Sequence, residues 1–249
     1  MVDLFSNLLD YVNRTAPAVG LIALIFVLAR PNRQVRVLLY TLTFILLRDA
    51  LTPSSLWSLG IAGGVPWIRF YPSHLFLIGM GVSSLLFTVL LVVGDRENSQ
   101  DVVFLRKGDS LRGWIASVVG LVVVLTPILI ASHRIGIEER GGAVDPNLLG
   151  SILVFALSGN LLEELLFRGY VYNLLKRRDA DLKAGVMSGF IFALCHVFLA
   201  TTVTSIGVPL LLFTVWEGVI CGIVGGKYGV LPAAAVHGGA IFVLASGLI

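Results

Sequence analysis

The sequence predicts an all-α fold, a polytopic bundle of about eight transmembrane helices. Three observations support this prediction. Of the 249 residues, 57% are hydrophobic and 13% are charged, whereas soluble domains carry about 25% charged residues. Apolar runs of about 20 residues, the length that crosses a bilayer as a helix, recur along the chain. Basic residues gather in the connections between these runs, as they do in membrane proteins.

The apolar runs define the expected helices in order. They lie at about 15–30, 35–52, 73–93, 112–132, 148–175, 184–201, 207–225 and 229–248. Residues 1–14 are expected to form an interfacial amphipathic segment, and residues 53–72, with their prolines and aromatic residues, an interfacial or re-entrant stretch. The N-terminus lacks a basic segment followed by a small-residue cleavage site, so we expect the first run to remain in the protein.

Lysine and arginine alternate between the two sides of the predicted bundle. The loops of one side hold twelve of them and those of the other side four, while Arg48 and Arg168 fall within spans. Because cytoplasmic loops carry the excess of positive charge, both termini are expected outside the cytoplasm. We expect a multi-pass integral membrane protein, in the plasma or inner membrane if the source is prokaryotic. The lipid bilayer is therefore an expected partner, and nucleic acid is not.

Ionisable side chains inside spans are the candidate functional residues, because each charge there costs about 2.5–3.5 kcal/mol on insertion scales. Arg48 and Asp49 lie side by side near the end of a span, where mutual pairing or snorkelling suffices, so we expect a structural role. Cys195 and Cys221 sit in apolar runs without metal-type spacing and are expected to be packing residues. The remaining ionisable groups are Glu163, Glu164, Arg168, His196, Glu217 and His237.

The fifth span brings three charges together within six residues. Arg168 follows Glu164 by four residues, so the two share a helix face and can form an ion pair. Glu163 points about 100° around the helix from Glu164 and can act as a base near that positive charge. The alternative is that all three residues form a buried ionic clamp between helices.

Two histidines in later spans add to this set. His196 shares a face with Phe192, four residues earlier, and His237 is flanked by small residues that permit close helix approach. One such histidine alone would be a hydrogen-bonded packing residue. Two of them, with a pair of glutamates, offer a carboxylate base, an imidazole able to share a proton and a second imidazole to donate to a developing oxyanion. These are the groups needed to activate water against a carbonyl.

The order Glu-Glu-x-x-x-Arg, Phe-x-x-x-His and a final His resembles the CAAX-protease and bacteriocin-processing family of intramembrane peptidases, also called the type II CAAX prenyl endopeptidase or abortive-infection family. The resemblance covers about residues 145–249, the core catalytic helices. Residues 1–144 hold membrane spans without a recognised motif, and both parts form one integrated membrane domain. The resemblance implies an endopeptidase that hydrolyses a peptide bond of a membrane-associated protein or peptide, in CAAX-type or bacteriocin-type processing, and it allows a prenylated substrate.

Carried over by position, the resemblance implies that Glu163 is the water-activating base with His196 as its partner. It implies that Glu164 and Arg168 form the supporting pair and that His237 stabilises the oxyanion. Two positions depart from the family pattern. Ile241 stands where the family has Asn or Asp four residues after the last histidine, and Thr214 stands four residues before Gly218 where the family has an aromatic residue.

These departures leave two readings of the function open. Glu217, inside the seventh span, is hypothesised to compensate for Ile241 by orienting His237 or water. Alternatively, the chain is a catalytically impaired relative that acts as a membrane peptide-binding, immunity or scaffold protein. We expect that no cofactor is required, although Glu163, His196 and His237 are candidate ligands for Zn²⁺. The sequence contains neither H-E-x-x-H nor G-x-S-x-G, which sets aside two other classes of protease.

Overall fold

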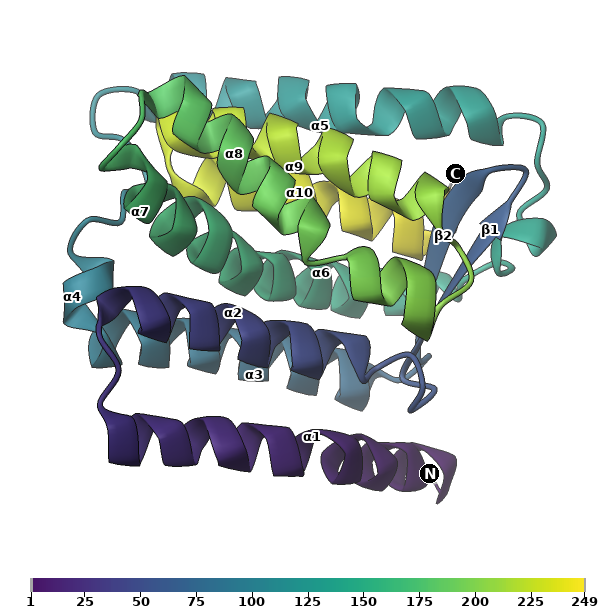
Figure 1. The fold of residues 1–249 in the computed structure, drawn as a ribbon. Helices are drawn as coiled ribbons and strands as arrows, with labels where there is room; N and C mark the ends of the chain where they lie inside the picture. Colours follow the sequence, from purple (N-terminus) through teal and green to yellow (C-terminus); the bar gives the residue numbers. More distant parts are fainter. Residues whose placement is uncertain (1, 249) are drawn as a thin grey trace.

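The computed structural model of the chain describes residues 2–248 and is a bundle of long helices that run along a common direction (Figure 1). The long helices are α1 (Val2–Ala29), α2 (Arg33–Asp49), α3 (His74–Gly94), α5 (Ser110–Ser132), α6 (Leu149–Glu164), α8 (Asp181–Leu194), α9 (Val208–Tyr228) and α10 (Val230–Ser246). The shorter elements are α4 (Arg96–Ser99), α7 (Tyr172–Lys176), the 3₁₀ turns Glu138–Arg140 and Pro146–Leu148, and the π-helical segments Leu165–Val171 and Leu199–Val203.

The predicted helical membrane bundle is confirmed. Within residues 2–248, six helical stretches are long and apolar enough to cross a membrane, and α10 is a shorter apolar helix. Helix α2 also runs along the bundle, but it carries charged residues at both ends and is the least apolar of the long helices. Large apolar side chains such as Leu28 and Leu75 are more than 70% exposed on the outside, as expected where the surroundings are lipid. The chain is therefore an integral membrane protein.

Residues 2–14 do not form the separate segment that the sequence predicts, because they belong to one continuous helix. Helix α1 extends over 28 residues with Pro17 inside it, which corresponds to about 42 Å at 1.5 Å per residue. No helix-ending signal separates residues 1–14 from the apolar run that follows. The helix ends only where Arg30 adopts a positive φ of 44° and Pro31 follows.

The structure of residues 53–72 also differs from the predicted interfacial or re-entrant stretch, since these residues contain a β-hairpin. Strands β1 (Trp57–Ala62) and β2 (Val65–Phe70) pair antiparallel from Trp57 opposite Phe70 to Ala62 opposite Val65. Gly63 and Gly64 connect them with φ values of +53° and +84°, as a two-residue turn of a hairpin requires. The fold is thus mostly, not entirely, helical. The hairpin lies at the end of the bundle where both termini are found (Figure 1).

Helices α8 and α9 pack backbone against backbone. A Cβ atom on Gly222 would lie 2.1 Å from the carbonyl oxygen of Gly185, and one on Gly189 would lie 2.5 Å from that of Gly218. Only glycine allows this approach, as in the small-residue interfaces of membrane helices. Helix α10 packs closely on α6 at Gly238, as its small residues predicted. These contacts bring the chemistry-bearing residues of α6, α8, α9 and α10 together.

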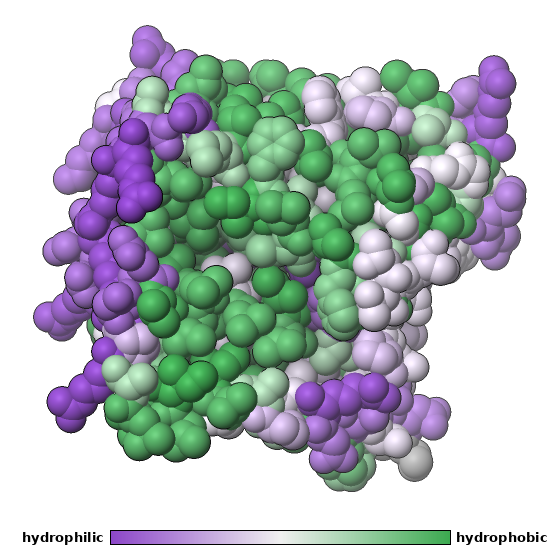
Figure 2. Space-filling view, in the orientation of Figure 1, coloured by the Kyte–Doolittle hydropathy of each residue, from purple (hydrophilic) through white to green (hydrophobic). Residues whose placement is uncertain are grey.

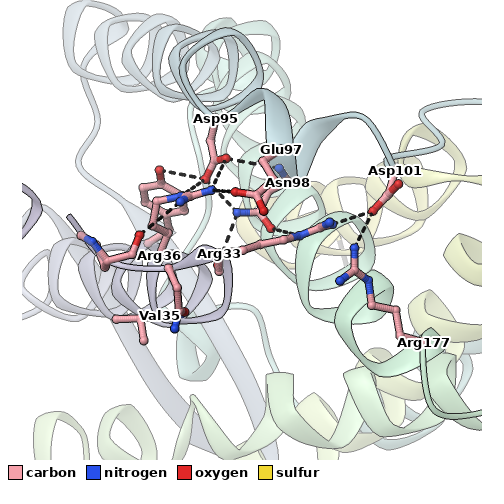
Figure 3. Close-up of polar contacts among 11 residues, drawn as sticks. Arg33, Val35, Arg36, Asp95, Glu97, Asn98, Asp101 and Arg177 are labelled. Atoms are coloured by element: carbon pink, nitrogen blue, oxygen red, sulfur yellow. Dashed lines mark hydrogen bonds and ion pairs between the residues drawn. The ribbon is translucent and has the colours of Figure 1, made fainter.

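The opposite end of the bundle is strongly hydrophilic and is tied together by ion pairs (Figures 2 and 3). Arg36 pairs with Asp95 at 2.8 Å and with Glu97 at 2.6 Å, and Arg33 pairs with Asp101 at 2.6 Å. These contacts join the start of α2 to α4 and the loop after it. We call this set the polar cluster; it comprises Arg33, Arg36, Asp95, Glu97, Asn98, Asp101 and Arg177.

Candidate active site

The ionisable residues singled out from the sequence converge at the middle of the bundle. Glu163 and Glu164 end α6, and Arg168 follows in the π-helical segment Leu165–Val171. Single-turn π segments are frequent at functional sites. His196 lies just after the end of α8, whereas Glu217 lies in α9 and His237 in α10. Six ionisable residues of the site are buried: Glu163, Glu164, Arg168, His196, Glu217 and His237.

Glu164 is shared between a cation and a histidine. Arg168 Nη1 donates to Glu164 Oε1 at 2.8 Å, which confirms the predicted contact four residues along the helix. Arg168 Nη2 donates to the carbonyl oxygen of Gly218 at 2.8 Å, and His237 Nδ1 lies 2.9 Å from the same Glu164 Oε1. Because a carboxylate only accepts hydrogen bonds, His237 Nδ1 is the donor when Glu164 is ionised. Glu164 and Arg168 thus orient the ring of His237.

The other ring nitrogen of His237 faces two carboxylates. His237 Nε2 lies 3.9 Å from Glu163 Oε2 and 3.6 Å from Glu217 Oε2. Glu217 Oε1 is buried and has no hydrogen-bond partner among residues 2–248. A buried polar atom without a partner is costly, so it marks a place where a proton, a water or a substrate group is accommodated. Glu217, which the sequence analysis hypothesises to orient His237 or water, therefore lies beside His237 in this group.

Arg48 also enters the site, from helix α2, which the sequence analysis did not foresee. The predicted pairing with Asp49 is present, with Nε 2.8 Å from Asp49 Oδ1. In addition, Arg48 Nη1 lies 2.8 Å from His196 Nε2 and 3.3 Å from Glu163 Oε1. The two residues that the resemblance pairs, Glu163 and His196, thus meet through the guanidinium of Arg48.

A cavity of about 170 Å³ adjoins these groups. Its walls are mostly apolar, and Glu163, His196, Glu217 and His237 all contribute to its lining. Ile241 is part of the wall as well, four residues after His237. The space-filling view shows a hollow among the apolar side chains near the middle of the face drawn, with hydrophilic atoms visible at its bottom (Figure 2). An apolar cavity with a few convergent polar groups is typical of a substrate site.

The arrangement does not suit the Zn²⁺ ion for which Glu163, His196 and His237 are candidate ligands. Among residues 2–248, no group of three or more His, Cys, Asp or Glu residues is placed to hold a metal ion. A zinc-bound histidine uses the lone pair of one ring nitrogen. His196 Nε2 already faces the Arg48 guanidinium, and its Nδ1 lies 2.8 Å from the carbonyl oxygen of Phe192.

One stretch of the chain matches a known family. Residues 145–243 match the model of the family described as type II CAAX prenyl endopeptidase Rce1-like. The matched stretch contains every candidate residue of α6, α8, α9 and α10, whereas Arg48 and Asp49 lie outside it. No curated protein and no solved structure matches the chain.

Proposed function

Since residues 145–243 form an Rce1-like type II CAAX prenyl endopeptidase domain, we propose that this chain is an intramembrane endopeptidase that cleaves a membrane-associated protein or peptide. The family consists of intramembrane glutamyl proteases. The observation that carries the proposal is the placement of two buried carboxylates, Glu163 and Glu217, at 3.9 Å and 3.6 Å from His237 Nε2 at the wall of an apolar cavity. A water molecule held among these groups would be shielded from bulk solvent and would lie close to a general base.

In the proposed reaction, Glu163 takes a proton from water while the water oxygen bonds to the carbonyl carbon of the scissile peptide. The electron pair of the carbonyl moves to its oxygen, and His237, protonated on both ring nitrogens, donates from Nε2 to this oxyanion. When the carbon–nitrogen bond breaks, Glu163 returns its proton to the leaving amine. The products are a carboxylic acid and an amine, which exchange a proton in water to become a carboxylate and an ammonium group, and Glu163 is ionised again.

Glu217 is proposed to perform the task that Ile241 cannot. An isoleucine side chain neither donates nor accepts hydrogen bonds, so it cannot hold water or an oxyanion. Glu217 Oε2 is within 3.6 Å of His237 Nε2 and its Oε1 is unpartnered, so it can orient both the imidazole and the water. Glu164 and Arg168 support His237 from its other side.

The proposal is tested with the purified protein in liposomes, using a farnesylated peptide and the same peptide without its lipid. Glu163→Gln and His237→Gln keep side-chain size and should each lower the cleavage rate about 10²–10⁴-fold, because each removes a group that moves or stabilises charge in the reaction. Glu217→Gln should lower it about 10²-fold. Glu97→Gln removes an exposed carboxylate of the polar cluster and is the matched control, which should cleave like the parent.

Full activity of Glu163→Gln would overturn the proposal. The proposal would also be overturned if the parent protein left intact a peptide that an active relative cleaves. A peptide-binding role without cleavage would then be favoured. Faster cleavage of the farnesylated peptide would assign a prenylated substrate. We further propose that no metal takes part, so a chelator should leave the rate unchanged, and a loss that Zn²⁺ restores would refute this.

A further inference from the structure

Arg48 makes more contacts than a structural ion pair with Asp49 requires. It is buried, with 7% of its surface exposed. Besides its contact with Asp49, it donates from Nη2 to the carbonyl oxygen of Cys195 at 2.9 Å. All three nitrogens of its guanidinium therefore have partners, and these partners come from α2, α6 and the turn after α8. A planar, always charged group with fixed donor directions is suited to set the positions of several acceptors at once.

The contacts of His196 determine which of its ring nitrogens carries the proton. Arginine can only donate hydrogen bonds, so His196 Nε2, at 2.8 Å from Arg48 Nη1, must accept. A backbone carbonyl can only accept, so His196 Nδ1, at 2.8 Å from the Phe192 oxygen, must donate. Both contacts require the same form of the ring, neutral with the proton on Nδ1. A proton on Nε2 would point directly at a cation.

We infer that Arg48, anchored by Asp49, is a positioning residue that completes the active site from outside the matched domain. It places the Glu163 carboxylate and locks His196 as the neutral Nδ1–H tautomer. His196 is then a fixed support for the site, and Glu163, not His196, takes the proton from water. This inference rests on the proposed peptidase function for its catalytic consequence, whereas the tautomer follows from the geometry alone.

The inference also gives α2 a role in the reaction. Residue Arg48 is separated from Glu163 by 115 positions along the chain and from His196 by 148. A shift of α2 relative to α6 would move a charge out of hydrogen-bond reach of the base. Misplacements of about 1 Å can cost on the order of 10²-fold in rate, so the N-terminal helices do more than surround the catalytic ones.

The test has one arm that needs no activity. The chain contains four histidines, so ¹⁵N-histidine labelling gives few ring signals, and the His196→Asn variant identifies those of His196. The parent should show His196 with a protonated Nδ1 and an unprotonated Nε2. In the Arg48→Met variant the Nε2 signal should shift, because that nitrogen loses its donor, whereas Nδ1 keeps the Phe192 oxygen as its acceptor. A protonated Nε2 in the parent would overturn the inference. The expected pattern would support the placement of Arg48 even if no peptide is cleaved.

The second arm measures kinetics with a cleaved peptide. Arg48→Met should lower kcat about 10²-fold and leave KM within about twofold, because the side chain aligns the base rather than the bulk of the substrate. Arg48→Lys keeps the charge but cannot reach all partners from one ammonium, so its kcat should lie between those of the Met variant and the parent. Arg112→Gln, at the exposed start of α5, is the control and should cleave normally. Parent-like kcat in Arg48→Met would refute the positioning role while leaving the proposed peptidase intact.

Discussion

The glycine contact between α8 and α9 allows a stability prediction that depends on no substrate. In the Gly222→Ala variant the new methyl group would lie 2.1 Å from the Gly185 carbonyl oxygen and 2.9 Å from its carbon. Ordinary contacts need about 3.5 Å, so the two backbones must separate by more than about 1 Å. The two Gly185 atoms that the new methyl group would contact belong to the backbone, so no change of side-chain rotamer can relieve the clash.

The expected cost of this overpacking is about 1–3 kcal/mol. For a chain of this size, each kcal/mol lowers the thermal midpoint by about 2–4 °C, so Gly222→Ala should unfold about 2–12 °C below the parent. The assay is thermal unfolding in detergent followed by tryptophan fluorescence. The matched control is Gly79→Ala in α3, where a new Cβ meets nothing within 4 Å; the control gains helix propensity without a clash. Equal midpoints for the two alanine variants would refute the close packing of α8 on α9.

Two further predictions concern charges. Arg168→Ala leaves the Glu164 carboxylate buried without its cation, which should cost about 3–5 kcal/mol and lower the thermal midpoint, whereas a parent-like midpoint would contradict the buried ion pair. Burial raises the pKa of Asp95, but hydrogen bonds from Arg36 and Asn98 outweigh it and hold that pKa below its ordinary value of 3.8. A depressed pKa stabilises the folded state above the unfolded value, and this contribution is lost as pH falls through the folded pKa. Midpoints measured from about pH 7 to pH 3 should therefore fall more steeply for the parent than for Asp95→Asn, and parallel curves would count against the assignment.

The sequence predicted those parts of the site that depend on local spacing. Glu164 and Arg168 are four residues apart and meet, and His196 contacts the backbone of Phe192, also four residues away. Arg48 could not be assigned in the same way. Its neighbour Asp49 offers an adequate local partner, and nothing in a single sequence indicates a contact between residues 115 positions apart.

The errors in the fold have a similar origin. Residues 1–14 have the composition of an interfacial helix, but the sequence contains no stop between them and the next apolar run, so α1 continues. In residues 53–72 the prolines and aromatic residues favour an interfacial stretch. The pair Gly63-Gly64 between two short runs, however, is typical of a hairpin turn.

The register of the hairpin has a consequence for how this segment can vary between related proteins. Trp57, Leu59, Ile68 and Phe70 all project from one face of β1 and β2 and form part of the cavity wall, while the pair Ser58 and Arg69 occupies the other face. Because side chains alternate along a strand, inserting or deleting one residue within either strand would exchange these faces and present a serine or an arginine to the cavity. We therefore expect substitutions in this segment to be far better tolerated than changes in its length.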